Sequence, residues 1–264
     1  MLKQKWVSSA RTDIGTVRKI NEDDFLDASE VAMWCVADGM GGHQKGDVAS
    51  RMICDYLKCL ATPESYPITP TQVKERINQV NERLIALADT QPESSVIGST
   101  VVVLVFDQQS AHCIWAGDSR IYRLRQNQLT RLTRDHSQVE ELVEAGLLSA
   151  EDAESHPAAN VITRAVGAHE ELDLDVISVP LQQGDIFLLC SDGLNKVMND
   201  NEIAEYLISH SLDALPELFI QTALERNARD NVTALTVKYD GVATDGIAPN
   251  SGSPSLDDTL PLVR

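Results

Sequence analysis

Residues 31–39 read Val-Ala-Met-Trp-Cys-Val-Ala-Asp-Gly, an apolar run that ends in an acidic residue and a glycine. Its first seven residues form the longest uninterrupted apolar stretch of the chain. A continuous apolar run is typical of a strand in a sheet that is covered on both faces, whereas a half-exposed strand alternates. A membrane-spanning helix needs about 20 apolar residues, far more than this stretch supplies. The stretch therefore predicts a buried strand with a carboxylate at its end.

Other short runs extend this picture to an α+β fold. Four of them are rich in β-branched and large apolar residues and are expected to be strands: residues 101–106, 112–116, 186–190 and 232–237. Helices are expected over residues 48–60, 201–209 and 213–228. Another begins at Thr69, because Pro70 in the first turn and Gln72 three residues on complete a capping box. Runs of strands alternate with pairs of helices, which favours antiparallel sheets with helices outside them over a doubly wound parallel sheet.

Composition narrows the classes of function. The chain has 264 residues, of which 43% are hydrophobic and 23% charged, as in soluble globular proteins. Its 22 Lys and Arg against 40 Asp and Glu give a formal net charge of −18 at pH 7. Such a surface repels nucleic acid and anionic membranes. The five cysteines form no CxxC pair, so neither a zinc site nor a disulfide framework is expected.

The pattern along the chain predicts one domain and a tail. Residues 1–240 carry dense apolar patterning, whereas residues 241–264 are dominated by Gly, Pro, Ser, Thr and Asp and are expected to be a disordered C-terminal tail. No apolar block follows Lys3 and Lys5 as it would in a secretory signal. We therefore expect a cytoplasmic location.

Carboxylates stand where the expected strands begin or end: Glu22-Asp23-Asp24, Asp38, Asp118, Asp192 and Asp230. Each one alone is explained well enough as a turn residue, because Asp hydrogen-bonds nearby backbone and a following Gly tolerates positive φ. Together they indicate that the fold gathers mutually repelling carboxylates, which bound cations make tolerable. Oxygen ligands without His or Cys pairs nearby select Mg²⁺ or Mn²⁺.

The glycine-rich segment after Asp38, residues 39–46, matches neither GxGxxG nor GxxxxGK[ST]. We interpret its glycines as a tight turn that lets a main-chain carbonyl join the carboxylate as a metal ligand. His43 lies in this segment, and a lone loop histidine is more often a solvent-facing residue than a functional one.

Six motifs follow one another along the chain: Arg18-x-x-Asn21-Glu22-Asp23, Val36-Ala37-Asp38-Gly39-Met40-Gly41-Gly42, Gly98-Ser99-Thr100, Ala116-Gly117-Asp118-Ser119-Arg120, Ser191-Asp192-Gly193-Leu194 and Arg229-Asp230-Asn231-Val232-Thr233. In order and spacing they resemble the motifs of the bacterial type of the PP2C (PPM) family of metal-dependent protein serine/threonine phosphatases. The resemblance covers roughly residues 8–240. It implies a four-layer α/β/β/α sandwich, in which two central antiparallel sheets are flanked by helix pairs.

The resemblance also implies a site with two Mn²⁺ or Mg²⁺ ions at one end of the sheets. Asp38 would bridge both ions, the carbonyl of Gly39 would bind one, and Asp192 and Asp230 the other. A third, weaker ion would be held by Asp118 together with Asp192. The residues expected to hold metal-bound waters or to stand behind the ligands are Glu22, Asp23 and Asn231.

The chemistry implied is attack on phosphorus by a water that bridges two cations, without a phosphoenzyme. Arg18 is the expected phosphate clamp, because its planar fork can hold two phosphoryl oxygens. Eukaryotic members place a His directly after the Asp-Gly pair, where this chain has Met40. His43 or a metal-bound water is therefore the candidate general acid.

The charged, helix-prone segment of residues 134–167 corresponds to a mobile flap beside the site in bacterial relatives. Its acids are Glu140, Glu141, Glu144, Glu151, Asp152 and Glu154. They either select basic phosphopeptides by charge or simply form a solvated helix face.

The expected partners are phosphorylated protein substrates and an opposing Ser/Thr kinase, with the chain acting as a monomer. Two rival functions stay open at this point. One is a phosphoprotein-binding regulator that keeps the fold with little catalysis. The other is a two-metal nuclease or phosphodiesterase, which the net charge of −18 opposes.

Overall fold

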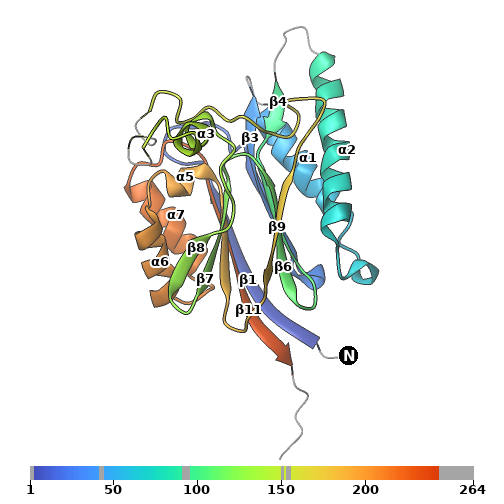
Figure 1. Cartoon of the computed structure of the whole chain (residues 1–264), viewed down its shortest axis with the longest axis vertical. Coiled ribbons are helices and arrows are strands. Elements are labelled where there is room, and N and C mark those ends of the chain that lie inside the picture. Colours follow the sequence, from blue (N-terminus) through green and yellow to red (C-terminus); the bar gives the residue numbers. More distant parts are fainter. Residues whose placement is uncertain (1–2, 42–44, 91–95, 150–151, 153–155, 244–264) are drawn as a thin grey trace, which may run out of the picture.

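The computed structural model describes residues 3–41, 45–90, 96–149, 152 and 156–243. Two antiparallel sheets lie face to face at the centre of the molecule, with helices outside each of them (Figure 1). The first sheet has the strand order β1 (Lys3–Asp13), β11 (Val232–Ala243), β10 (Ile186–Cys190), β7 (Arg120–Arg125), β8 (Gln128–Arg131). The second has the order β2 (Asp23–Ala28), β3 (Met33–Gly41), β5 (Val101–Phe106), β6 (Ser110–Ala116), β9 (Asp175–Pro180), and β4 (Ile97–Ser99) pairs with the end of β3.

Helices cover the outer face of each sheet. The second sheet is covered by α1 (Gly46–Lys58) and α2 (Pro70–Asp89), and the first by α5 (Asp192–Asn195), α6 (Asp200–Ser209) and α7 (Leu215–Glu225). Short 3₁₀ turns occupy Ser29–Val31 and Pro63–Ser65, and α3 (Gln138–Glu144) lies at the end of the sandwich where α5 begins (Figure 1). The expected four-layer α/β/β/α sandwich is confirmed.

The apolar run of residues 31–37 does not alternate with polar residues because β3 lies inside a sheet that is covered on both faces. On β3, Trp34 and Val36 pack between the two sheets together with Phe187 of β10. Their neighbours Met33 and Cys35 face the other way, into the core beneath α1 and α2. Because successive side chains of a strand point to opposite faces, both faces must be apolar when both are covered.

Most elements expected from pattern are confirmed. Strands β5 and β10 have the predicted limits, and α2 begins with the predicted capping box: the backbone N–H of Gln72 donates to the Thr69 hydroxyl, and that of Thr69 to the Gln72 side chain. The last strand, β11, continues to Ala243 opposite Lys3 of β1, three residues beyond the predicted domain boundary at residue 240. The rest of the expected tail, residues 244–264, lies outside the described residues.

The described part of the chain has neither a disulfide bond nor a helix that could span a membrane. All five cysteines lie in it and are free thiols. None of its helices combines the length and the apolar character that crossing a lipid bilayer requires.

Candidate metal centre

Asp38 stands near the end of β3, and both its N–H and its carbonyl are held by the adjacent residues Ser99 and Thr100. Its N–H donates to the Thr100 hydroxyl at 3.2 Å, and its carbonyl accepts from the Ser99 hydroxyl at 2.9 Å and from the Thr100 N–H at 2.8 Å. The Gly98-Ser99-Thr100 motif is thus a clamp on the Asp38 main chain. The Asp38 carboxylate takes no part in these three bonds.

Asp23 on β2 lies directly opposite Asp38 and is buried. Its Oδ2 accepts hydrogen bonds from the hydroxyls of Ser191 and Thr233, both at 2.7 Å, so it joins the second sheet to the first. Its Oδ1 is buried and has no hydrogen-bond partner within the described residues. Burial, and the nearby Asp192 and Asp230 carboxylates, raise the pKa of Asp23 to about 7.

Asp118 and Asp192 approach from the first turns after β6 and β10. Both are buried, and each has a buried Oδ1 without a partner in the part of the chain that the structure describes. Burial and the nearby Asp192 charge raise the pKa of Asp118 to about 7. Gly117 reaches Asp118 with φ +108°, where a Cβ would lie 2.6 Å from Cβ of Thr100.

Asp230 and Arg18 close the site from the β11 side. The Arg18 guanidinium donates to Asp230 Oδ2 at 2.7 Å while its side chain stays 48% exposed. The Asn231 side chain links β11 to the loop before β2. It accepts from the N–H of Glu22 at 2.8 Å and donates to the carbonyls of Ile14 and Ile20. The loop that carries Arg18 and Glu22 is thereby fixed to the start of β11.

Gly39 and Gly46 touch where β3 turns into α1. A Cβ on Gly39 would lie 2.0 Å from the carbonyl oxygen of Gly46, and one on Gly46 would lie 2.6 Å from Oε1 of Glu22. Glu22 Oε1 in turn accepts from the Gly46 N–H at 3.1 Å. The glycines are therefore needed for close backbone approach beside Asp38, as the sequence predicts.

The electrostatics show that the acids from the strand ends converge. Burial raises the pKa of Asp38 well above its usual range, and the charges of Asp23, Asp192, Asp118 and Asp230 raise it further. Within the described ranges no three His, Cys, Asp or Glu side chains already close around one point as a finished cage would. The fit to a metal therefore rests on the three orphaned buried oxygens of Asp23, Asp118 and Asp192 and on the purely oxygen character of the donors.

A family model described as "Protein phosphatase 2C" matches residues 16–236. The chain belongs to the protein phosphatase 2C family. It is 37% identical over 241 residues to the serine/threonine phosphatase stp of Listeria monocytogenes, a match that covers 87% of this chain and 94% of that protein.

Solved structures of PP2C relatives share the fold. The chain resembles PppA of Pseudomonas aeruginosa, a regulatory component of the T6SS, with a TM-score of 0.81 and 43% identity over 89% of this chain and 97% of the other. It also resembles the catalytic domain of the phosphatase PstP in complex with two manganese ions, with a TM-score of 0.82 and 30% identity over 90% and 99% of the two chains.

Lys196 is the residue at this PP2C site that sequence reasoning missed. It caps the short helix α5 one turn after Asp192, and its Nζ contacts Asp192 Oδ2. The Asp192-to-Lys196 spacing of four residues at a helix start could have revealed it, because residues four apart share a helix face.

The acids in residues 134–167, the predicted flap, are partly neutralised by arginines nearby in the chain. Glu140 accepts from Arg131 at 3.1 Å, and Glu144 is paired with Arg134. The start of this segment lies beside Asp118, since the backbone N–H of His136 donates to the Gly117 carbonyl at 2.9 Å. Two of the other acids, Glu151 and Glu154, lie outside the described residues, as does His43.

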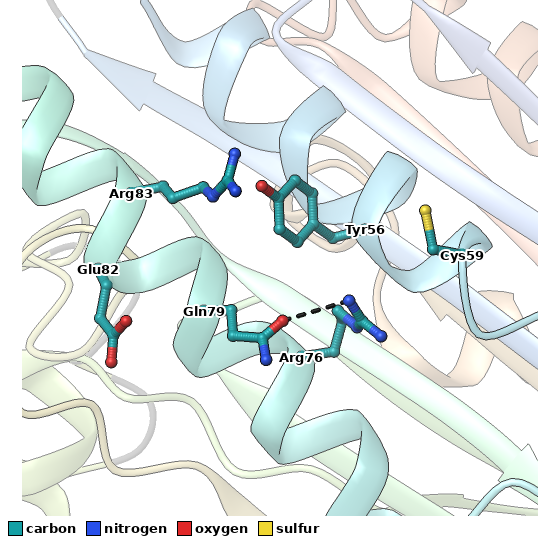
Figure 2. Close-up of a pocket in the computed structure, with 6 residues that line it drawn as sticks. All are labelled: Tyr56, Cys59, Arg76, Gln79, Glu82 and Arg83. Carbon is teal, nitrogen blue, oxygen red and sulfur yellow. Dashed lines mark hydrogen bonds between the residues drawn. The ribbon is translucent and has the colours of Figure 1, made fainter.

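A separate hollow of about 510 Å³ lies between α1 and α2 on the outside of the PP2C sandwich (Figure 2). It is lined by Tyr56, Cys59, Arg76, Gln79, Glu82 and Arg83. Arg83 stands over the Tyr56 ring with its guanidinium carbon 5.0 Å from the centroid, and Arg76 donates to Gln79. None of the strand-end acids lines it, so the candidate metal centre and this hollow are distinct places.

Proposed function

We propose that this PP2C chain hydrolyses phosphoserine and phosphothreonine monoesters of proteins, with two Mn²⁺ or Mg²⁺ ions held by Asp38, the Gly39 carbonyl, Asp192 and Asp230. The observation that carries the proposal is the convergence of buried carboxylates from separate strands whose Oδ1 atoms lack partners in the described structure. Relatives named serine/threonine phosphatases and the two manganese ions in the PstP complex support the same chemistry.

The residues suit this cofactor. Clustered buried carboxylates repel one another, and hard divalent cations both neutralise them and prefer their oxygens. When bound, such a pair of cations supplies a nucleophile at neutral pH by lowering the pKa of a water, and neutralises phosphoryl charge.

The chain's own residues then position the substrate. Arg18 donates one N–H to Asp230, and its half-exposed guanidinium has further N–H donors for the oxygens of a phosphoryl group. The bond to Asp230 fixes the fork beside the ligands, which lowers the entropy cost of binding. Glu22 and Asp23 support the turn and the ligand strand, and Asn231 holds the loop that carries Arg18.

The leaving oxygen needs a proton, and the residue directly after Gly39 is Met40, whose side chain cannot donate one. Met40 there pairs with Gly98 in the β3–β4 ladder. His43 remains the candidate general acid, and a metal-bound water is the alternative. Asp118 and Asp192 are the residues at which the PP2C resemblance implies a third, weaker cation.

The proposal extends to the setting of the enzyme: protein substrates phosphorylated by an opposing Ser/Thr kinase, a cytoplasmic location and a monomeric chain. Gel filtration with light scattering tests the last point, and a mass of twice 28.9 kDa would contradict it.

The deciding experiment measures hydrolysis of p-nitrophenyl phosphate and of a phosphothreonine peptide with Mn²⁺, with Mg²⁺ and with EDTA. Wild type is compared with Asp38→Asn and Asp192→Asn, and with Asp89→Asn at the exposed end of α2 as the matched control. We expect metal-dependent turnover that both site variants abolish and the control keeps. A folded wild type without turnover under any metal would favour the phosphoprotein-binding regulator, and activity on a diester alone would favour a phosphodiesterase.

A further inference from the structure

Lys196 brings a positive charge into the acidic cluster. Its Nζ contacts Oδ2 of Asp192, while its side chain is 39% exposed and that of Asp192 only 11%. The ammonium also acts on Asp118, whose pKa it lowers, and the charges of Asp192, Asp118 and Asp230 raise the pKa of Lys196 itself. Lys196 therefore contacts Asp192 and lies close enough to Asp118 for their charges to interact.

The two oxygens of Asp192 are divided by this contact. Oδ2 is taken by Lys196, whereas Oδ1 is buried and has no partner in the described structure. Asp118 keeps a buried, unpartnered Oδ1 as well. One Asp192 oxygen thus stays available for the principal ions, whereas the other is already paired with a cation from the chain itself.

We propose that the ammonium of Lys196 takes the place of a third metal ion between Asp118 and Asp192, so that this chain binds two divalent ions and completes the cluster with its own side chain. The inference rests on the proposed two-metal function. A fixed ammonium repels an incoming dication in the same place, and it gives up no translational freedom when the site forms. The resemblance implied a third ion at Asp118 and Asp192, and in this proposal the Lys196 side chain supplies the positive charge instead.

The test counts bound Mn²⁺ by equilibrium dialysis and isothermal titration, starting from EDTA-treated protein. Wild type is expected to bind two ions per chain. Lys196→Gln removes the charge. Its dissociation constant for a third ion should be at least tenfold lower than any that wild type shows. Lys196→Arg keeps a cation and should behave as wild type, and Lys58→Gln at the exposed end of α1 controls for the change of net charge.

A double variant locates the added ion. Asp118→Asn combined with Lys196→Gln should return the count to two, because it removes one of the carboxylates that the ion would use. A third ion that survives in the double variant would place it elsewhere and overturn the proposal.

Wild type alone also decides the matter if Lys196→Gln fails to fold. Three saturable ions per wild-type chain, or an unchanged count in a folded Lys196→Gln, would overturn the proposal. Failure of the underlying function looks different, because wild type would then bind no Mn²⁺ and show no metal-dependent turnover.

Discussion

Replacing Asp118 with Asn should stabilise the metal-free protein, and the gain should grow with pH. Burial and the Asp192 charge raise the pKa of Asp118 from 3.8 to about 7. Between these values the folded protein holds a proton on this carboxyl that the unfolded chain has lost. The unfolding free energy of wild type therefore falls as pH rises through the window, by about 1.4 kcal/mol per pH unit for this group.

A window of about three pH units sets the size of the effect. The full difference is about 4 kcal/mol, reached once pH exceeds the folded-state pKa of Asp118. Asn is a neutral isostere and does not titrate, so Asp118→Asn should exceed wild type by about 1 kcal/mol at pH 4.5 and by about 4 kcal/mol at pH 8. The burial-lowered pKa of His136 gives an opposite slope, but both proteins carry it and it cancels in the difference.

Urea unfolding of EDTA-treated wild type and Asp118→Asn at pH 4.5, 6 and 8 measures this difference, with the slope of each transition checked for two-state behaviour. Asp89→Asn is the control, because it removes an exposed charge at the end of α2. A variant-minus-wild-type difference that is the same at pH 4.5 and pH 8 would refute the reasoning. So would a variant that is less stable than wild type at pH 8.

Three further predictions concern the backbone, the general acid and the end of the chain. Gly39→Ala should destabilise the fold by about 2–4 kcal/mol in urea unfolding, because its Cβ would lie 2.0 Å from the Gly46 carbonyl oxygen; a loss below about 1 kcal/mol would contradict this. His43→Ala should lower kcat on p-nitrophenyl phosphate less than tenfold, and a loss beyond a hundredfold would show that His43 is the acid. Deleting residues 244–264 should leave kcat/KM on the same ester unchanged, whereas deleting from residue 241 should not, because it cuts into β11.

Sequence pattern predicted the strands that lie in the middle of the sheets. β5 and β10 are apolar on both faces because both faces are covered, so their limits follow from composition alone. The polar strand β1 carries little such signal. It forms because β11, more than 200 residues away in the chain, offers a paired edge from Asp13 to Lys3.

The same contrast holds at the site. Asp38 and Asp192 were predicted because each stands at the end of an apolar run, a local feature of the sequence. The hydroxyls of Ser191 and Thr233 on Asp23 depend on how the two sheets meet, which no local pattern contains. Lys196 has a local signal in its spacing of four residues from Asp192, but its influence on Asp118 depends on how separate strands meet.

The pairing of β1 with β11 has a consequence for the protein during its synthesis. A ribosome makes β1 first and must add more than 200 residues before its partner emerges, and the ligand candidate Asp230 and the linking residue Asn231 arrive only with that partner. A nascent or prematurely terminated chain lacking β11 leaves the edges of both β1 and β10 unpaired and its acidic cluster incomplete. The enzyme therefore becomes active only after nearly the whole domain has been synthesised. A truncated product is expected to be inactive and prone to aggregate rather than partly active.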